Sequence, residues 1–404
     1  MIKNTFYIFA GRVSNVVFLF LLTLVVSRQL GPALFGIFSF LTTIVIAASC
    51  FANLGLDTWM VREVTKDPER GRHYLSNILG LKTGASLITI ILVFLIFQLT
   101  DLPENTQHLL WVISASILFN SLSQALWHYG NCFKKFIYHS ALWASSNIIK
   151  SVLGISLVLL YHEIEPLILG VVIAEFATLI ISFLVIRKRF GKFSIEFDFL
   201  VWKDFLSRSS PIAFGMIFSV LYFRLDIVML QIMTGEKTVG WYSAAYKLFE
   251  ATLILPHSFM LVLFPTLVGE YHADKLKFKK SFQKSILVFS IIGGGITLVF
   301  WFFSDWIIAF IYGEKFSPSV SLLNILSVAV FLFFINFLLS NILITSGREK
   351  INTWILIMAT ILNIFLNLSL IPKYGAEGAA WATIFCEGAL VAAMSLQVKK
   401  VIKC

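Results

Sequence analysis

Ionisable side chains lie inside the long apolar runs of this 404-residue chain, and they are its main candidates for binding or catalysis. The clearest set is Ser243, Tyr246, Lys247, Glu250 and His257, whose three-, four- and seven-residue steps place them on one helix face. Lys247 and Glu250, three residues apart, are spaced to form an ion pair. Such a stripe can bind an anion, carry an ion or hold helices together.

Other apolar runs carry polar stripes of the same kind. Between residues 209 and 233, Arg224 shares a face with Gln231, whereas Asp226 shares another with Tyr222 and Ser219. A charged residue in mid-bilayer costs about 2.5–3.5 kcal/mol on insertion scales, so these side chains should face a shared interior and not lipid. Further aligned or clustered polar sets are Thr5, Arg12 and Asn15; Ser116, Asn120, Ser123, Gln124 and Trp127; Asn147, Lys150 and Ser151; Thr360, Asn363 and Asn367; and the single acids Glu175 and Glu387.

The composition places these stripes in a membrane protein. Hydrophobic residues make up 58% of the chain and charged residues 13%, and the mean hydropathy is +0.87. A soluble domain carries about 25% charged residues, so a soluble enzyme, a disordered protein and a nucleic-acid binder are disfavoured. The four cysteines lack CxxC spacing, and no Walker A, HExxH or GxSxG motif occurs. The sequence predicts no enzyme, no metal site and no cofactor.

Apolar runs separated by polar breaks predict twelve transmembrane helices, each about 20 residues or longer. The first is expected to be retained, because no short apolar region ends in a small-residue cleavage site. The predicted spans lie near 6–27, 35–56, 75–98, 108–130, 140–160, 166–186, 209–233, 240–265, 285–311, 319–345, 352–371 and 376–397.

The 32 basic residues predict the orientation. The loops after even-numbered spans, together with both termini, hold 22 of them, the opposite side holds 4, and 6 lie in or beside spans. Basic loops are cytoplasmic in multi-pass proteins. Both termini are therefore predicted to be cytoplasmic. Most of the net charge of +10 is explained by these cytoplasmic loops and does not indicate an anionic partner.

The two halves of the chain share a short pattern. Residues 30–39 align without gaps on residues 234–243, with Gly31 on Gly235 and Ser39 on Ser243. Each copy lies between the first two spans of its half, which predicts a parallel repeat related by an axis along the membrane normal. Chance similarity of two turns is the alternative. The expected organisation is an N-terminal lobe at 1–190, a cytoplasmic amphipathic linker at 191–208 and a C-terminal lobe at 209–404.

Several of these segments resemble the Wzx-type flippases of polysaccharide biosynthesis, in the multidrug/oligosaccharidyl-lipid/polysaccharide (MOP) exporter superfamily. The resemblance extends over the whole chain, although its motifs are loose. It is carried by Arg28–Pro32, Phe35–Ser39, Asn53–Asp57, Arg62-Glu63, Tyr222–Asp226 and Val239–Leu248.

The resemblance implies two six-helix bundles in a V around a central, often cationic cavity. It also implies transfer of undecaprenyl-diphosphate-linked oligosaccharide across the bacterial inner membrane by alternating access, driven by a proton or sodium gradient. A polysaccharide polymerase and a chain-length regulator are possible partners. Lipid II flippases usually have extra spans, which argues against a peptidoglycan precursor as substrate.

The stripes then receive expected roles. The diphosphate is expected to bind Arg12, Lys150, Arg224 and Lys247. Sugar-contacting candidates are Asn120, Gln124, Asn147, Tyr246, Asn363 and Asn367. Ion-coupling candidates are Asp57, Glu175, Asp226, Glu250 and Glu387.

Three alternatives stay open at this point. The charges could pair off as structural contacts between helices. A drug or metabolite cation antiporter of the same architecture would also carry intramembrane acids. A membrane scaffold could have twelve spans, although it would not need Lys and Arg stripes in both lobes.

Overall fold

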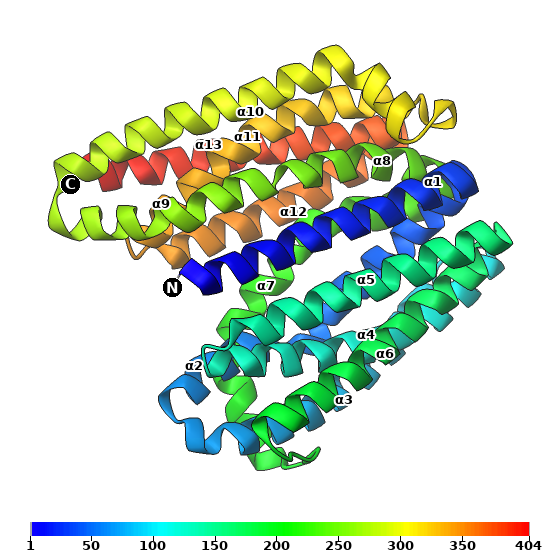
Figure 1. The fold of residues 1–404 in the computed structure, drawn as a ribbon. Coiled ribbons are helices and arrows are strands. Elements are labelled where there is room, and N and C mark those ends of the chain that lie inside the picture. Colours follow the sequence, from blue (N-terminus) through cyan, green and yellow to red (C-terminus); the bar gives the residue numbers. More distant parts are fainter. Residues whose placement is uncertain (1, 404) are drawn as a thin grey trace. The chain divides into compact units, whose positions relative to one another are not determined.

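The structure is a computed structural model that describes the backbone of residues 2–403 and the side chains of residues 11, 14 and 16–402. Regular structure over residues 2–403 is helical throughout (Figure 1). The helices are α1 Ile2–Asn53, α2 Leu56–Lys66, η1 Pro68–Arg70, α3 Gly71–Gln98, α4 Glu104–Cys132, α5 Phe136–Tyr161, α6 Ile164–Phe190, α7 Phe199–Thr234, α8 Glu236–Thr252, α9 Ile254–Ala273, α10 Lys275–Ile311, η2 Glu314–Phe316, α11 Ser319–Thr345, α12 Glu349–Tyr374 and α13 Ala376–Lys403.

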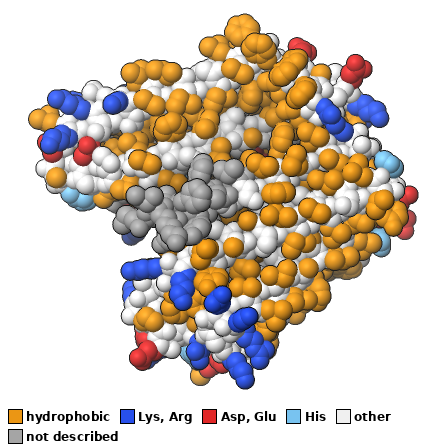
Figure 2. Space-filling view, in the orientation of Figure 1, with side chains coloured by type: hydrophobic (Ala, Val, Ile, Leu, Met, Phe, Trp, Pro, Cys, Tyr) orange, Lys and Arg blue, Asp and Glu red, His pale blue; other side chains and the backbone are white. Residues whose placement is uncertain are grey.

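The predicted all-helical, polytopic membrane fold is confirmed. Within residues 2–403, eleven helical stretches are long and apolar enough to cross a membrane. The number is eleven and not twelve because the first two predicted spans join in α1 across a kink at Gly31. Hydrophobic side chains cover the helices on the face shown in Figure 2, and Lys and Arg gather towards helix ends.

The kink at Gly31 has the same backbone geometry as the turn at its aligned counterpart in the second half. Gly31 has φ 76° and ψ −179°, and its aligned counterpart Gly235, between α7 and α8, has φ 88° and ψ 178°. This region of backbone space is open essentially to glycine alone. The two halves therefore turn between their first and second spans with the same glycine conformation. Gly191 (φ 95°, ψ 175°) and Gly313 (φ 89°, ψ 172°) adopt it at other helix ends, so the repeat stays a prediction.

The break between α8 and α9 follows from a proline. Pro256 lacks a backbone N–H, and its ring clashes with the carbonyl four residues earlier, at Thr252. The helix α8 ends at Thr252 and α9 begins at Ile254. The eighth predicted span is therefore interrupted at Leu253, as the proline requires.

The chain divides into two compact units, residues 1–220 (the N-terminal unit) and 221–404 (the C-terminal unit). In the N-terminal unit, α1 packs along α5, and α4 packs against α3 and α6. In the C-terminal unit, α11 packs against α8, α10 and α13, and α12 packs against α13. The V shape, the relating axis and the central cavity stay predictions.

The second part of the predicted linker is continuous with the predicted seventh span in one helix. Residues 191–198 have no regular structure, and α7 then runs from Phe199 to Thr234. Asp198 caps its start, because Oδ1 accepts hydrogen bonds from the N–H groups of Leu200 (3.0 Å) and Val201 (3.3 Å). The first turns of α7 anchor to the N-terminal unit through Phe205, whose ring centroid lies 4.5 Å from that of Trp59.

Close packing of α12 on α13 leads to a first prediction. A Cβ at Gly378 would collide with the backbone of Leu370 and would lie 3.0 Å from the Ile371 nitrogen, whereas a Cβ at Gly388 would meet nothing within 4 Å. Gly378→Ala should therefore lose about 1–3 kcal/mol of stability, in the range of overpacked cores. Thermal unfolding of the purified protein in detergent measures this. Gly388→Ala on the same helix is the control, and equal melting temperatures of the two variants would contradict the packing.

Candidate functional site

A buried ion pair lies where α2 meets α3 in the N-terminal unit. Lys82 Nζ lies 2.6 Å from Asp57 Oδ1 and donates a second hydrogen bond to the Ser121 carbonyl oxygen at 3.0 Å. Both charged side chains are almost completely buried, and His128 Nδ1 lies 3.8 Å from Asp57 Oδ2. Burial of one charge without the other would be costly, so this pair holds the two helices together.

The exposed end of α2 carries a separate ionic cluster. Lys66 Nζ and Arg62 Nε each lie 3.0 Å from Glu63 Oε1. The hydrogen bond from Lys66, with a further one from Arg62, holds the pKa of Glu63 below its usual range. Arg62 is thus engaged at the protein surface and does not reach the buried Asp57 pair.

A second ion pair joins α5 and α6. Lys150 Nζ lies 2.9 Å from Glu175 Oε1, which also accepts a 3.4 Å hydrogen bond from Asn120 Nδ2. The Gln124 amide donates to Asn120 Oδ1 at 2.6 Å and accepts from Asn53 at 3.2 Å. These contacts form a continuous chain of polar side chains through the N-terminal unit, and it brings four predicted residues together: Asn120, Gln124, Lys150 and Glu175.

In the C-terminal unit, two cations share one carboxylate. Arg224 Nη2 on α7 lies 2.7 Å from Glu250 Oε1 on α8, and Lys247 Nζ lies 3.4 Å from Glu250 Oε2. The predicted proximity of Lys247 and Glu250 is present, and Arg224 joins them from the neighbouring helix. Two positive charges against one negative charge leave this cluster with a formal charge of +1. Lys247 remains 34% exposed, so the excess charge is accessible.

A different arrangement surrounds Asp226, which is 2% exposed. Its Oδ1 accepts a 2.7 Å hydrogen bond from Asn367 Nδ2, and its Oδ2 accepts from the hydroxyls of Tyr242 (2.9 Å) and Thr383 (3.1 Å). Asn363 supports this shell, because its Oδ1 accepts from Asn367 at 3.0 Å. Side chains from α8, α12 and α13 therefore converge on a carboxyl of α7.

Glu387 on α13 repeats this pattern one turn away. Its Oε1 accepts a 2.7 Å hydrogen bond from the Tyr222 hydroxyl, and its Oε2 accepts from Asn336 Nδ2 at 3.0 Å. Glu387 is 1% exposed. Tyr222 and Asp226 are four residues apart on α7, as are Thr383 and Glu387 on α13, so the two sites are about one helical turn apart along these helices.

The five acidic candidates thus divide into two classes. Asp57, Glu175 and Glu250 each lie within 3 Å of a lysine or arginine nitrogen. Asp226 and Glu387 have neutral partners, and neither has a basic group within 4.0 Å among the side chains that the structure describes. An unpaired charge in an apolar interior is costly, and this distinguishes these two acids from the three that have a cation beside them.

The remaining predicted residues are placed as follows. The side chain of Arg12 lies outside the described residues. Asn147 donates to the Trp143 carbonyl of its own helix at 2.9 Å, and the Tyr246 hydroxyl donates to the Phe223 carbonyl at 3.0 Å. Asn363 and Asn367, predicted as sugar contacts, surround Asp226 instead of an open surface. Asn120 and Gln124 are half-buried.

Several residues of these sites were given no role from the sequence. Lys82 could have been found, since a lysine inside an apolar run requires a counter-charge. Tyr242 and Tyr222 bind acids on other helices, and no spacing along one helix reveals that contact. Asn336 and Thr383 gave no signal in the sequence.

With this geometry in place, the comparisons with known proteins identify the family. The family described as polysaccharide biosynthesis protein matches residues 1–270, about two thirds of the chain. The chain belongs to this family. The MatE family matches residues 211–368, within the second half.

Relatives that align with most of the chain carry names that agree with this family. A Staphylococcus aureus protein named capsular polysaccharide biosynthesis protein CapF is 24% identical over 94% of both chains. A putative O-antigen transporter of Shigella flexneri is 22% identical over 88% of this chain and 87% of its own length. The putative O-antigen transporter of Escherichia coli K12 is 21% identical over 98% of this chain and 95% of its own.

Solved structures give the same fold. The lipid II flippase MurJ in an inward closed conformation superposes with a TM-score of 0.79 at 18% identity, over 99% of this chain and 88% of its own. A multidrug resistance MATE family transporter of the MOP superfamily has a TM-score of 0.70 at 15% identity, over 96% of both chains. The predicted resemblance to MOP-superfamily polysaccharide flippases is confirmed, and these neighbours are transporters and not enzymes.

The buried pair of Asp57 and Lys82 leads to a second prediction. Lys82→Met leaves Asp57 buried without its cation, which should cost about 3–5 kcal/mol. Asp57→Asn combined with Lys82→Met removes both charges and should recover most of that loss. Thermal unfolding in detergent and the yield of folded protein measure both variants. A double variant as unstable as the single one would show that the ionic contact is not the source of the loss.

Proposed function

We propose that the protein is a flippase that moves undecaprenyl-diphosphate-linked oligosaccharide repeat units from the cytoplasmic to the outer leaflet for surface polysaccharide synthesis. It acts by alternating access in the bacterial cytoplasmic membrane, with both termini cytoplasmic, and catalyses no covalent step. The observation that carries the proposal is the accessible excess of positive charge where Arg224 and Lys247 share Glu250. Membership of the polysaccharide biosynthesis protein family supports it.

The diphosphate binds the cluster of Arg224, Lys247 and Glu250. Of the predicted phosphate ligands with described side chains, Lys150 is matched one-to-one by Glu175, whereas Arg224 and Lys247 have a single carboxylate between them. The longer contact, 3.4 Å from Lys247 to Glu250, is the one that an incoming anion displaces. A charge interaction is stronger in such a partly desolvated site than in bulk water.

Polar side chains of the N-terminal unit contact the sugars. Asn120 and Gln124 are half-buried, and their amides both donate and accept hydrogen bonds, as sugar hydroxyls do. Lys150 and Arg12 are the remaining cationic candidates. Asn147 and Tyr246 can contact a sugar only after they give up their present hydrogen bonds to helix carbonyl oxygens.

Asp226 and Glu387 carry the coupling ion, a proton or a sodium ion. Neutral donors orient these carboxylates without cancelling their negative charge. Binding of a cation neutralises that charge and so removes the cost of burying it. The Thr383 hydroxyl lies 3.1 Å from both Asp226 Oδ2 and the Ala379 carbonyl oxygen, and its one hydrogen can serve only one of them. A protonated Asp226 donates to Thr383 and frees that hydrogen for Ala379, so the site accommodates the added proton.

Two further points belong to the proposal. A polysaccharide polymerase and a chain-length regulator act on the product in the outer leaflet and are the expected protein partners. A cation antiporter is the second candidate function, favoured by the MatE match over residues 211–368 and by two acids without basic partners. Efflux of a soluble cation by cells that express the protein would favour it.

The anion site gives a third prediction. Arg224→Ala, at normal abundance in the membrane, should abolish complementation in a strain that lacks this gene, because the remaining Lys247–Glu250 pair has no excess charge. Surface polysaccharide, resolved by gel electrophoresis, is the measurement. Arg208→Ala is the matched control, since Arg208 is also on α7, is exposed, and pairs with Asp204 at 2.8 Å. Full-length polysaccharide with Arg224→Ala would refute the cationic site.

The acids give a fourth prediction. In proteoliposomes with a fluorescent polyprenyl-diphosphate oligosaccharide, an imposed proton or sodium gradient should accelerate transfer by the wild-type protein. Asp226→Asn and Glu387→Gln should each lose at least about 90% of that acceleration, because an amide does not bind or release the ion. Asp305→Asn, an exposed acid on α10, should keep it. Variants that keep the full gradient response would place coupling elsewhere.

A further inference from the structure

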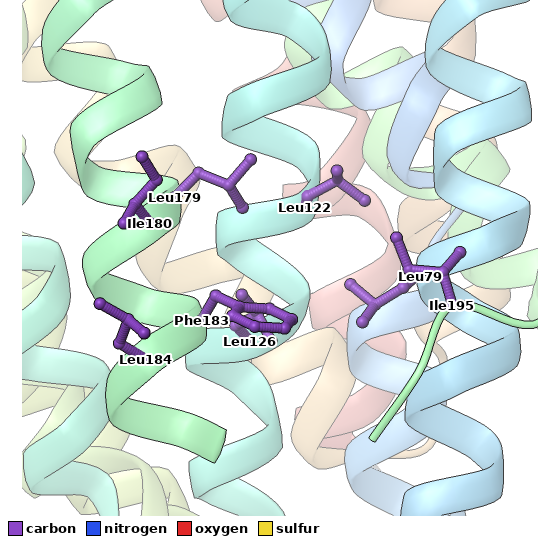
Figure 3. Close-up of a pocket in the computed structure, with 8 residues that line it drawn as sticks. All are labelled: Leu79, Leu122, Leu126, Leu179, Ile180, Phe183, Leu184 and Ile195. Atoms are coloured by element: carbon purple, nitrogen blue, oxygen red, sulfur yellow. The ribbon is translucent and has the colours of Figure 1, made fainter. Parts of the chain in front are cut away.

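An apolar pocket opens on the N-terminal unit (Figure 3). Its volume is about 230 Å³. The helix α4 forms its floor, α6 one wall, and α3 with the segment 191–198 the other. Its lining consists of Leu79, Leu122, Leu126, Leu179, Ile180, Phe183, Leu184 and Ile195.

The pocket has a buried floor and an exposed rim. Leu79, Leu122 and Leu126 are at most 8% exposed. Ile180, Leu184 and Ile195, by contrast, are 43%, 58% and 48% exposed. A cavity with an entirely apolar lining does not hold ordered water. In a bilayer the molecule available to fill it is a hydrocarbon chain.

The distance of the pocket from the helix ends matches the thickness of one leaflet. Leu79 is eight residues from the start of α3, and Leu122 is ten residues from the end of α4, which correspond to about 12 and 15 Å along the helices. Half of the hydrocarbon core is about 15 Å thick. These helix ends face the basic loops, which are cytoplasmic in the proposed orientation.

Cations surround the mouth of the pocket. The Arg187 guanidinium lies 5.8 Å from the ring centroid of Phe183, a lining residue. Lys188 is one turn beyond Leu184, Lys192 is three residues before Ile195, and the Arg72 guanidinium packs against Gly191. None of these four forms an ion pair within 4.0 Å among the described side chains. Their charge is therefore available to an anionic head group.

We propose that this pocket binds one acyl chain of an anionic phospholipid of the cytoplasmic leaflet, whose head group lies against Arg187, Lys188 and Lys192. Charge complementarity selects the anionic lipid, since each basic residue at the surface adds attraction to a negatively charged leaflet. The bound chain also packs against Ile195. It thereby stabilises the segment 191–198, which is held to α3 by a 3.1 Å hydrogen bond from the Glu196 N–H to the Ser76 carbonyl and a 2.9 Å one from Asn77 to Glu196.

The test uses photoactivatable phosphatidylglycerol with a diazirine in its acyl chain, in vesicles that contain the full-length protein. Peptides spanning residues 179–195 should be labelled several-fold more than with the matching phosphatidylcholine. The double variant Arg187→Gln/Lys188→Gln should remove that preference, and Ile180→Trp/Leu184→Trp should block labelling by filling the mouth. Phosphatidylglycerol should also raise the melting temperature of the wild-type protein and not of either variant.

Matched controls locate the effect. Lys279→Gln/Lys280→Gln removes two exposed basic residues of the C-terminal unit, and Ile173→Trp enlarges an exposed α6 residue that does not line the pocket. Both should leave the labelling unchanged. Equal labelling by the two phospholipids would overturn the proposal. So would efficient competition by a polyprenyl phosphate, which would assign the pocket to the transported lipid.

Discussion

A charge inside the membrane must be compensated within the protein, and this constraint organises both units. In the N-terminal unit, Lys82 lies against Asp57 and Lys150 against Glu175, so each buried acid has its own cation. In the C-terminal unit the compensation is incomplete in two opposite ways. Arg224 and Lys247 share a single carboxylate, that of Glu250. Asp226 and Glu387 accept hydrogen bonds from neutral donors, and no described side chain places a basic group within 4.0 Å of them. Incomplete compensation is what a ligand or an ion can complete.

The predicted alignment of the two halves makes this asymmetry clearer. Gly31 and Gly235 have the same backbone conformation, so their alignment can be extended along the adjoining helices. Phe38 then aligns with Tyr242, Leu22 with Asp226, and Ile46 with Glu250. The first half thus carries apolar side chains where the second carries an acid, its hydroxyl donor and the shared carboxylate.

Periodicity predicted what lies along one helix but not which helices meet. The all-helical fold, the helix break before Pro256 and the closeness of Lys247 to Glu250 follow from local rules. The contacts of Arg224 with Glu250, of Tyr242 with Asp226 and of Lys82 with Asp57 join different helices. Their formation depends on helix rotation and packing, which are set by many apolar side chains at once. For the same reason, Asn363 and Asn367 formed a convincing polar stripe, while its partner Asp226 could not be deduced.

The α7–α8 interface brings the proposed anion site and one of the proposed ion sites within two turns of each other. Tyr242 and Tyr246 stack with ring centroids 5.5 Å apart, and both bond to α7, at Asp226 and at the Phe223 carbonyl. Lys247 follows Tyr246 directly, and Arg224 follows Phe223. If an ion neutralises Asp226, the charge-assisted bond from Tyr242 weakens, because charged acceptors bind donors about twice as strongly as neutral ones. The tyrosine stack of α8, with Lys247 beside it, then loses one attachment to α7 and to Arg224 on that helix. If the proposed assignments hold, the same helix contact responds to both the ion and the diphosphate, which is the requirement for coupling their movements.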